Sequence, residues 1–280
     1  MAFTLTFWPV AAPLAGLVDA VYVARGGGEP FAACAGTLLP QVMWRLAGKV
    51  AWRCPGGAVR AIGAASVFGP STAALGIEGS GPLVAVGAGV FPEGWAALLP
   101  VSASALIEQV ADLADFWGAD ALRPLDADPS LPDRALAGQV QGVLLGRLGK
   151  LRPVDPRVGA INRWANGTGH DINQLVQRLG VSHRHLDRLE AGAHGLPPRL
   201  LANRHKILRM AAVLASGARD NRRDTWSSEY ADQAHFTRHF RRFIGATPTQ
   251  FMQDEELLVR GVLQVRLALA STHPLGLAAD

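Results

Sequence analysis

The stretch DQAHFTRHFRRFIGATP, residues 232–248, decides how the C-terminal half of the chain folds. Asp232 suits an N-cap, because its carboxylate can accept hydrogen bonds from the free backbone N–H groups of a first helical turn. Phe236, Phe240 and Phe243 are spaced by four and three residues, so a helix carries all three rings on one side. The glycine and proline that close the stretch are typical of a helix end. The stretch therefore predicts a short helix with a buried aromatic side.

The opposite side of this predicted helix is polar and basic. Its residues are Gln233, Thr237, Arg238, Arg241 and Arg242. Side chains of these types hydrogen-bond to base edges or to phosphate oxygens rather than pack into a core. The pattern favours a helix that enters a groove of double-stranded DNA. An ordinary amphipathic surface helix is the alternative that the pattern alone leaves open.

A second helical pattern lies upstream, at residues 171–189. An apolar stripe runs as far as Leu179, Gly180 can adopt the left-handed conformation of a tight turn, and Ser182 can cap a following helix. In that following helix Leu186 and Leu189 point inward. The residues left outside are in the positions where a recognition helix carries its base-reading side chains. These candidate DNA contacts are Ser182, His183, Arg184, Asp187 and Arg188.

Both patterns resemble a known family. YADQAHFTRHFRRFIGATP, residues 230–248, is similar to the second helix-turn-helix signature of AraC-type transcription regulators, and residues 171–198 resemble the first. The resemblance covers roughly residues 155–255 and implies a sequence-specific regulator that binds double-stranded DNA, with RNA polymerase as a further partner for an activator. It also implies that a linking helix, expected at 199–216, holds two recognition helices about 34 Å apart along the duplex.

The chain departs from the family pattern at two places. Glu190 stands where an aromatic residue usually follows the first recognition helix, which predicts weaker packing there. Residues 221–229 lack the apolar and small residues of a supporting helix, and Glu229 replaces a turn glycine. Two interpretations stay open: a second unit that folds fully only on DNA, or an impaired one. The second favours a degenerate relative that acts as an interaction or small-molecule-binding protein without binding DNA.

Charge divides the chain into two parts. Residues 1–149 carry 8 basic and 11 acidic residues, a net charge of −3, and residues 150–280 carry 19 and 12, a net charge of +7. A basic C-terminal half suits the neutralisation of phosphates. Two prolines and a glycine at 147–156 predict a linker. We expect a β-rich sensor or dimerisation domain with C-terminal helices at 1–150, a double helix-turn-helix domain at 155–255, and an unassigned tail at 256–280.

Short β-strands are predicted in the N-terminal half, separated by glycine and proline. They lie at 17–24, 37–39, 42–46, 50–53, 59–62, 74–77 and 83–90, and helices follow at 91–99 and 105–117. The glycine runs lack the pattern of a phosphate-binding loop, so turns are favoured. The fold class is α+β: a β-rich barrel or sandwich followed by an all-α domain. The order of Leu-Pro, Phe-Gly-Pro and VGAGVFPEGW at 86–95 resembles the cupin-like sensor domain of some AraC-type regulators, and a homodimer is left open.

An apolar interior could hold an effector. Candidate contacts are Trp44, Trp52, Phe68 and Phe91, with few charges nearby, which suits a small apolar or aromatic effector. The alternative is that these aromatic side chains simply form the core, as any domain of this size needs some.

An enzyme is the main competing class, and the composition argues against it. All eight histidines lie beyond residue 150, so the β-rich half has no imidazole for a catalytic metal, and we expect neither metal nor cofactor. Cys34 and Cys54 are interpreted as buried small hydrophobes, with a redox-sensing pair as the alternative.

The first residues of the chain do not have the pattern expected of a signal peptide or a membrane span. Residues 1–24 are apolar but lack a basic start and are broken by prolines, so we expect a cytoplasmic protein with no membrane partner. The hydrophobic tail at 257–279 could be an extra helix, a contact to a second copy, or a C-terminus that lies on the domain.

Overall fold

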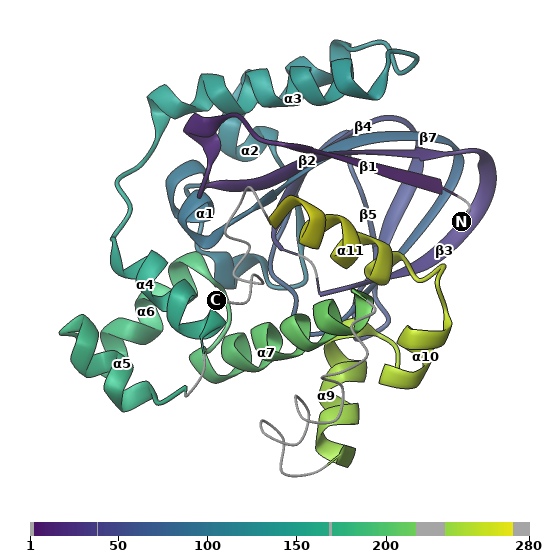
Figure 1. Ribbon diagram of the computed structural model, residues 1–280. Helices are drawn as coiled ribbons and strands as arrows, with labels where there is room; N and C mark the ends of the chain where they lie inside the picture. The colour runs from purple at the N-terminus through teal and green to yellow at the C-terminus, as the bar shows by residue number, and fades with distance from the viewer. Residues whose placement is uncertain (1–2, 38, 168–169, 217–232, 271–280) are drawn as a thin grey trace.

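A β-sheet and a group of helices make up the molecule (Figure 1). The computed structural model describes residues 3–37, 39–167, 170–216 and 233–270, with residues 3 and 266–270 as backbone alone. The described N-terminal half is rich in antiparallel strands, and the C-terminal half is helical. The predicted fold class, a β-rich part followed by an all-α part, is confirmed.

One antiparallel sheet of eight strands forms the N-terminal half. The strands are β1 (Phe3–Pro9), β2 (Val18–Gly26), β3 (Gly28–Gly36), β4 (Gln41–Arg53), β5 (Val59–Ala61), β6 (Ala65–Phe68), β7 (Leu75–Val90) and β8 (Val110–Asp112). Their main order is β1-β2-β7-β4-β6-β8, with β3 paired to β7 and β5 to β4. β7 is the central strand, because its first half pairs with β3, its second half with β2, and nearly its whole length with β4.

Several predicted strand limits are wrong. The pairs predicted at 42–46 and 50–53, and at 74–77 and 83–90, are single long strands, β4 and β7. The glycines in them do not end the strands. A Cβ at Gly79 would collide with the ring of Phe31, and one at Gly48 would lie 2.8 Å from Cα of Leu83. These glycines therefore serve close approach and bending. The strand predicted at 37–39 lies beyond the end of β3.

Helices continue the N-terminal half after β7. They are α1 (Pro92–Leu98), η2 (Ala103–Leu106), α2 (Ala114–Trp117), η3 (Gly118–Asp126), α3 (Asp133–Arg147) and η4 (Leu148–Lys150), with η1 (Ala12–Leu14) earlier. The helix predicted at 91–99 is confirmed as α1. The helix predicted at 105–117 is wrong, since β8 and two short helical segments occupy that range.

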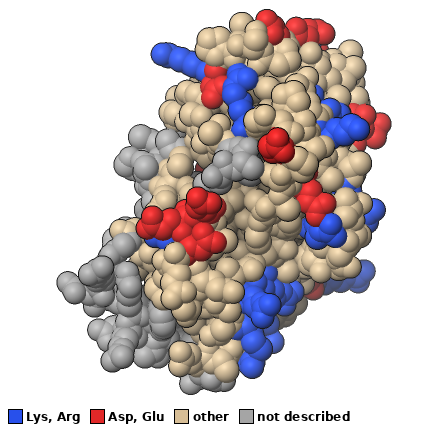
Figure 2. Space-filling model, turned by 90° about the vertical axis from the view of Figure 1, so that its right-hand side faces the viewer, with Lys and Arg blue, Asp and Glu red and all other residues tan. Residues whose placement is uncertain are grey.

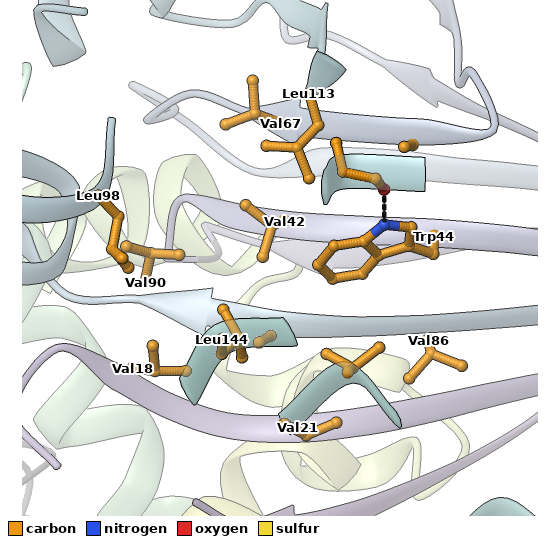
Figure 3. Packing of buried hydrophobic residues seen from close by; sticks show 14 of the residues in the cluster. Val18, Val21, Val42, Trp44, Val67, Val86, Val90, Leu98, Leu113 and Leu144 are labelled. Carbon is orange, nitrogen blue, oxygen red and sulfur yellow. Dashed lines mark hydrogen bonds between the residues drawn. The ribbon is translucent and has the colours of Figure 1, made fainter. Parts of the chain in front are cut away.

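One face of the sheet packs against α1, α2 and α3. Valines of the strands meet Leu98 of α1 and Leu144 of α3 in a buried cluster (Figure 3). Trp44 lies in this cluster, and its indole Nε1 donates a hydrogen bond of 2.5 Å to the carbonyl of Ala121. The side chains meet because alternate residues of a strand point to the same face.

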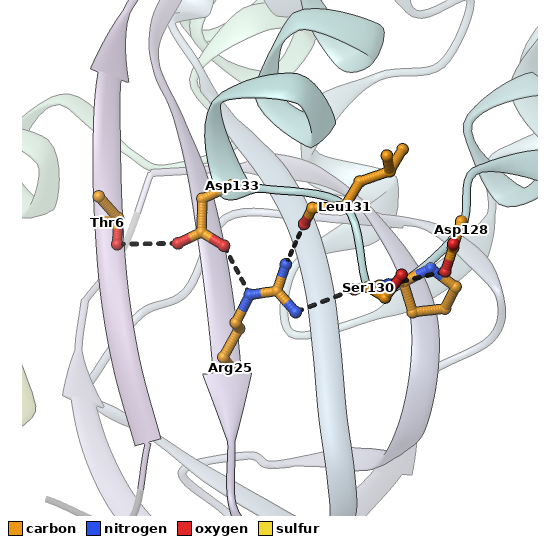
Figure 4. A network of polar contacts seen from close by, with 7 residues as sticks. Thr6, Arg25, Asp128, Ser130, Leu131 and Asp133 are labelled. Atoms are coloured by element: carbon orange, nitrogen blue, oxygen red, sulfur yellow. Dashed lines mark hydrogen bonds and ion pairs between the residues drawn. The ribbon is translucent and has the colours of Figure 1, made fainter.

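The start of α3 is tied to the sheet by one arginine. Arg25 of β2 pairs with Asp133 at 2.5 Å and donates to the carbonyls of Pro129 at 2.9 Å and Leu131 at 2.6 Å (Figure 4). Thr6 of β1 donates to the other oxygen of Asp133 at 3.2 Å. The guanidinium thus donates hydrogen bonds to carbonyls that precede the helix. Together with the ion pair, these bonds fix the start of α3 against β1 and β2.

The C-terminal half consists of helices. They are α4 (Arg157–Asn166), α5 (Ile172–Leu179), α6 (His183–Ala193), α7 (Pro198–Ala215), α9 (Gln233–Ile244), α10 (Pro248–Gln253) and α11 (Leu258–Ala270). Residues 151–156 join η4 to α4 without regular structure, at the predicted linker, and the proposed domain limits stay a prediction. α7 matches the predicted linking helix within one residue. It supplies Leu201 to the core around α5 and α6 and Ile207 to the core around α9, so it joins the two units.

The unassigned tail contains a helix. α11 covers 258–270 and packs against β3 and α7, where Leu258 and Val262 form an apolar cluster with Ala35 of β3. Of the three alternatives for the tail, the extra helix is confirmed over this range. Residues 271–280 lie outside the described residues. In the part of the chain that the structure describes, no helix has the length and apolar character that crossing a membrane requires.

Candidate nucleic-acid interface

The first helix-turn-helix has the predicted local geometry. Asp171 caps α5, and its carboxylate accepts from the backbone N–H groups of Asn173 at 2.8 Å and Gln174 at 3.2 Å. Gly180 is left-handed, with φ 63° and ψ 39°. Ser182 caps α6 by accepting from His185 N at 3.2 Å. The glycine turn and the serine cap are therefore confirmed, and both orient α6 relative to α5.

The predicted reading side chains of α6 are exposed. His183, Arg184, Asp187 and Arg188 all face solvent, while Leu186 is buried. Ser182 is also exposed, although its hydroxyl serves the helix cap. The structure brings these five residues together on the first turns of α6, where a recognition helix meets base edges.

The aromatic side of α9 is confirmed. Phe236, Phe240 and Phe243 are buried, with the ring of Phe240 at 5.5 Å from those of Phe236 and Phe251. α9 begins at Gln233; the predicted cap Asp232, and the degenerate stretch at 221–229, lie outside the described residues.

The polar side of α9 divides into two parts. Gln233, Arg238 and Arg241 are exposed, and Figure 2 shows Lys and Arg gathered near the lower end of the molecule, at the height of α9. Thr237 is half-buried and its hydroxyl donates to the carbonyl of Gln233 at 2.9 Å. Arg242 was expected on the DNA side, but its Nε donates to the carbonyl of Thr72 at 3.0 Å, so its side chain contacts the N-terminal half.

A comparison with protein families decides what these helices are. Residues 175–254 match a family model described as a helix-turn-helix domain, and this range contains both predicted recognition helices. The C-terminal half carries an AraC-type helix-turn-helix domain. The predicted resemblance is confirmed for this domain.

Solved structures of ToxT from Vibrio cholerae are similar to this chain over most of its length. One at 1.65 Å resolution has 10% sequence identity and a TM-score of 0.47, and the match covers 90% of this chain and 98% of that chain. One bound to (E)-4-(8-methylnaphthalen-1-yl)but-3-enoic acid has 10% identity and a TM-score of 0.46, with 90% and 99% covered. Wild-type ToxT of strain SCE256 with unsaturated fatty acid bound has 12% identity and a TM-score of 0.44, with 84% and 94% covered. No curated protein matches the chain.

The helix-turn-helix domain contains a buried carboxyl. Glu190 of α6 is 1% exposed, and neither of its carboxylate oxygens has a hydrogen-bond partner within the described part of the chain. Burial, and to a smaller extent the charge of Asp187, raises the pKa of Glu190 to about 9. The carboxyl is therefore neutral at physiological pH, and the weak packing expected at this position stays a prediction.

Three buried cationic or imidazole groups lie near the middle of the domain and were not singled out from the sequence. Burial lowers the pKa of His194 to about 3 and that of Arg204 to about 10, and lowers the pKa of His205 well below its usual value. The positive charge of Arg204 lowers the pKa of both histidines further. The sequence contained a signal for two of these buried groups, because Arg204 and His205 interrupt the apolar positions of the long helix α7.

The end of α6 lies against the N-terminal half. Gly195 is left-handed, with φ 72°, and a Cβ there would lie 2.5 Å from Cγ of Pro70 and 3.0 Å from the carbonyl carbon of Ala103. The hydroxyl of Ser102 donates to the carbonyl of Ala191 at 2.7 Å. These contacts join the first recognition helix to η2 and to the loop before β7.

The end of α9 is held more extensively. Thr37 donates to the carbonyl of Phe243 from its backbone N at 2.8 Å and from its hydroxyl at 3.1 Å. Ala74 N donates to the carbonyl of Arg242 at 2.7 Å. The last carbonyls of a helix have no partner inside it, and here the N-terminal half supplies the donors. Gly245 follows with φ 86°, and a Cβ there would collide with Sγ of Cys34.

A small cavity lies between the other face of the sheet and α11. Its volume is about 90 Å³, and Leu258 and Val262 of α11 line it together with apolar residues of the strands. The polar lining residues are Asp19, Tyr22 and Gln41, and the Tyr22 hydroxyl donates to Oε1 of Gln41. An apolar cavity of roughly 150 Å³ holds benzene, so this one admits only a few heavy atoms unless α11 moves.

Only one of the four predicted effector contacts lines this cavity. Trp52 does, whereas Trp44, Phe68 and Phe91 are buried elsewhere. Trp44 points to the opposite face of β4 from Met43, a lining residue that the sequence reasoning missed. The pairing of β4 with β7 shifts register after Arg45, and such bulges change which face later residues occupy, which places Trp52 on the cavity side. Phe68 packs beneath Trp52, with ring centroids 4.0 Å apart.

Both cysteines are free thiols. The Cys34 thiol donates to the carbonyl of Ile244 at 3.5 Å and the Cys54 thiol to that of Glu108 at 3.4 Å. Burial raises the pKa of the Cys34 thiol. A less ionised thiol is a weaker nucleophile, so the interpretation as packed, unreactive side chains fits better than that of a redox-sensing pair.

Proposed function

We propose that the protein is a DNA-binding transcription regulator that responds to a small apolar effector. The observation that carries this proposal is an AraC-type helix-turn-helix domain in which α6 and α9 expose polar side chains. The C-terminal ends of both helices contact the N-terminal half, which contains the cavity. The net charge of +7 over residues 150–280 supports contact with phosphates.

Two sets of side chains would contact DNA. In α6 these are Ser182, His183, Arg184, Asp187 and Arg188, and in α9 they are Gln233, Thr237, Arg238 and Arg241. Arginine can bind guanine through two hydrogen bonds and glutamine can bind adenine, which suits direct reading of bases in the major groove. Their exposure, with Thr237 the half-buried exception, supports this role.

The effector would act through α11 and β3. A molecule in the cavity touches Leu258 and Val262 of α11 and Ala35 of β3. Cys34 lies next to Ala35, and Thr37 just beyond the strand, and both hold the end of α9. A ligand that prefers one arrangement of these contacts changes DNA affinity by its preference for that arrangement. The predicted homodimer and the RNA polymerase contact stay predictions.

A gel shift tests the DNA-binding function. The wild-type chain, Arg184→Ala and Arg238→Ala are titrated on fragments from upstream of the gene and on random DNA, over a salt series. If the arginine reads a base, its replacement by alanine should cost about 1 to 3 kcal/mol of binding free energy on the specific fragment and less on random DNA. Arg60→Ala, an exposed residue of β5, is the matched control and should change nothing.

Two results would change the assignment. Equal losses on both DNAs would make the arginine a phosphate contact. Absence of wild-type binding even at low salt would favour the alternative, an interaction or small-molecule-binding relative, which the departure of residues 221–229 from the family pattern supports.

A further inference from the structure

One loop of the N-terminal half contacts both recognition helices. It joins β6 to β7 and covers residues 69–74, and it is named the β6–β7 loop. Its first three residues are buried, and Pro70 among them lies against the end of α6. A Cβ at Gly195, the glycine that follows α6, would lie 2.5 Å from Cγ of this proline. The loop and the end of the first recognition helix are therefore in direct contact.

The second half of the β6–β7 loop contacts the end of α9. Ala74 N donates to the carbonyl of Arg242 at 2.7 Å, and Arg242 Nε donates to the carbonyl of Thr72 at 3.0 Å. Two residues of the loop thus hold one residue of α9 through its backbone and through its side chain. Because α6 and α9 belong to different units, the loop connects these units at the ends of their recognition helices, whereas α7 connects their cores.

Glu108 holds the β6–β7 loop in this position. Its carboxylate Oε1 accepts from the Thr72 hydroxyl at 2.5 Å and from the Thr72 backbone N at 3.3 Å. Its backbone N donates to the carbonyl of Pro70 at 2.9 Å, so Glu108 binds the loop beside each of the two helix contacts. Glu108 has φ 54°, the only positive φ of a residue other than glycine in the part of the chain that the structure describes. A side chain with a Cβ adopts this conformation at a cost, and it persists where the surrounding contacts favour it.

We propose that the β6–β7 loop sets the relative position of the two recognition helices, and that Glu108 is the positioning residue of the loop. The connection at the helix ends, added to that of the cores through α7, limits rotation of one unit relative to the other. The consequence for DNA rests on the proposed function: the loop determines which separation of two half-sites the chain binds. Two recognition helices meet one face of the duplex when their half-sites lie about one helical turn, about 10 base pairs, apart.

A gel shift with altered half-site spacing tests this specificity. The wild-type chain first selects a binding sequence from a random library of double-stranded DNA, and a second probe carries about 5 further base pairs, half a turn, between the halves. Glu108→Ala removes the acceptor of Thr72, so it should bind the selected probe about 10-fold more weakly and discriminate less between the two spacings. Its affinity for a probe with a single half-site should not change. Thr72→Val, which removes the hydroxyl and keeps the shape, should act in the same direction.

Two variants serve as controls for the gel shift. Glu108→Gln keeps an oxygen that can accept from Thr72, so it should retain the spacing preference of the wild type. Glu29→Ala, at an exposed position of β3, removes the same charge without touching the loop and should also retain this preference. An unchanged preference in both Glu108→Ala and Thr72→Val overturns the specificity role. Equal weakening on the single half-site and on the selected probe indicates general destabilisation and overturns the positioning role, as does tighter binding by either variant.

Hydrogen exchange of the full chain without DNA tests the shared support independently. Exchange should accelerate at the ends of both α6 and α9 in Glu108→Ala, and at neither in Glu29→Ala. Acceleration at one of the two helices alone overturns the shared support. Thr72→Val repeats the measurement should Glu108→Ala lose its thermal transition. A wild-type chain that selects no DNA overturns the proposed function, and the exchange result then decides whether the loop supports both helices.

Discussion

The two recognition helices are held by the rest of the molecule in different ways. Both α6 and α9 are followed by a left-handed glycine that presses on the N-terminal half, Gly195 and Gly245. Among the residues that the structure describes, the last carbonyls of α9 also accept backbone hydrogen bonds from Thr37 and Ala74, whereas α6 accepts one hydrogen bond from the N-terminal half, from the Ser102 side chain. The N-terminal half therefore holds the second helix mainly by hydrogen bonds and the first mainly by packing against α1 and η2.

The two helix-turn-helix units, one around α5 and α6 and the other around α9, also differ in their interiors. The second has an aromatic core, and the first has a buried carboxyl, Glu190, in the position where an aromatic residue is expected. The first unit thus has an unpaired carboxyl in its interior, and fewer hydrogen bonds tie its recognition helix to the described N-terminal half. The second has an aromatic core, and backbone hydrogen bonds from the N-terminal half hold the end of its recognition helix.

The largest expected effect tests the aromatic core. Phe240 is fully buried between Phe236 and Phe251, so Phe240→Ala should lower the free energy of unfolding by about 3 to 5 kcal/mol. Urea denaturation measures this change. Leu189→Ala, at a half-buried position of the first unit, should cost less. A cost for Phe240→Ala below that of Leu189→Ala would reverse the comparison.

A second variant tests how α9 is held. Gly245→Ala introduces a left-handed alanine and a collision with Cys34, and should cost about 1 to 3 kcal/mol. Gly180→Ala is the matched control, because Gly180 is also left-handed but has open space at the Cβ position. Hydrogen exchange should show faster opening at the end of α9 only in Gly245→Ala. Equal costs for the two variants would mean that the contact with the N-terminal half contributes nothing.

The smallest effect concerns Glu190 and has a definite pH dependence. Its pKa in the folded chain, about 9, is raised above the ordinary 4.5, so the folded state binds more protons between these values. The stability associated with this group is full below about pH 4.5 and is lost as the pH rises toward 9. Glu190→Leu should therefore stabilise the chain by about 1 to 2 kcal/mol at pH 8, and by less at pH 5.

Melting temperatures at pH 5 and pH 8 measure this difference. His194 and His205 act in the opposite direction, since their lowered pKa values remove stability as the pH falls below 6.5. They are present in both proteins, so they cancel in the comparison. A gain from Glu190→Leu that grows as the pH falls would contradict the assignment of a neutral buried carboxyl.

Local signals explain which parts could be predicted from the sequence. Gly180, Ser182 and the spacing of Phe236, Phe240 and Phe243 each specify a conformation or a face within a few residues. Gly79 of β7 was misread as a turn residue because it accommodates the ring of Phe31 from β3. The position of Trp52 depends on a register shift in β4, and the contribution of α11 to the cavity depends on a contact more than 200 residues distant in sequence. No local pattern contains either fact.

The presence of α11 beside the sheet limits how the protein can be recombined. A hybrid that joins the first 150 residues to a foreign DNA-binding domain would lose Leu258 and Val262, and with them one wall of the cavity. The cavity and the helix-turn-helix domain are therefore not independent modules in this chain. A functional chimera has to take its last helix from the same parent as its strands.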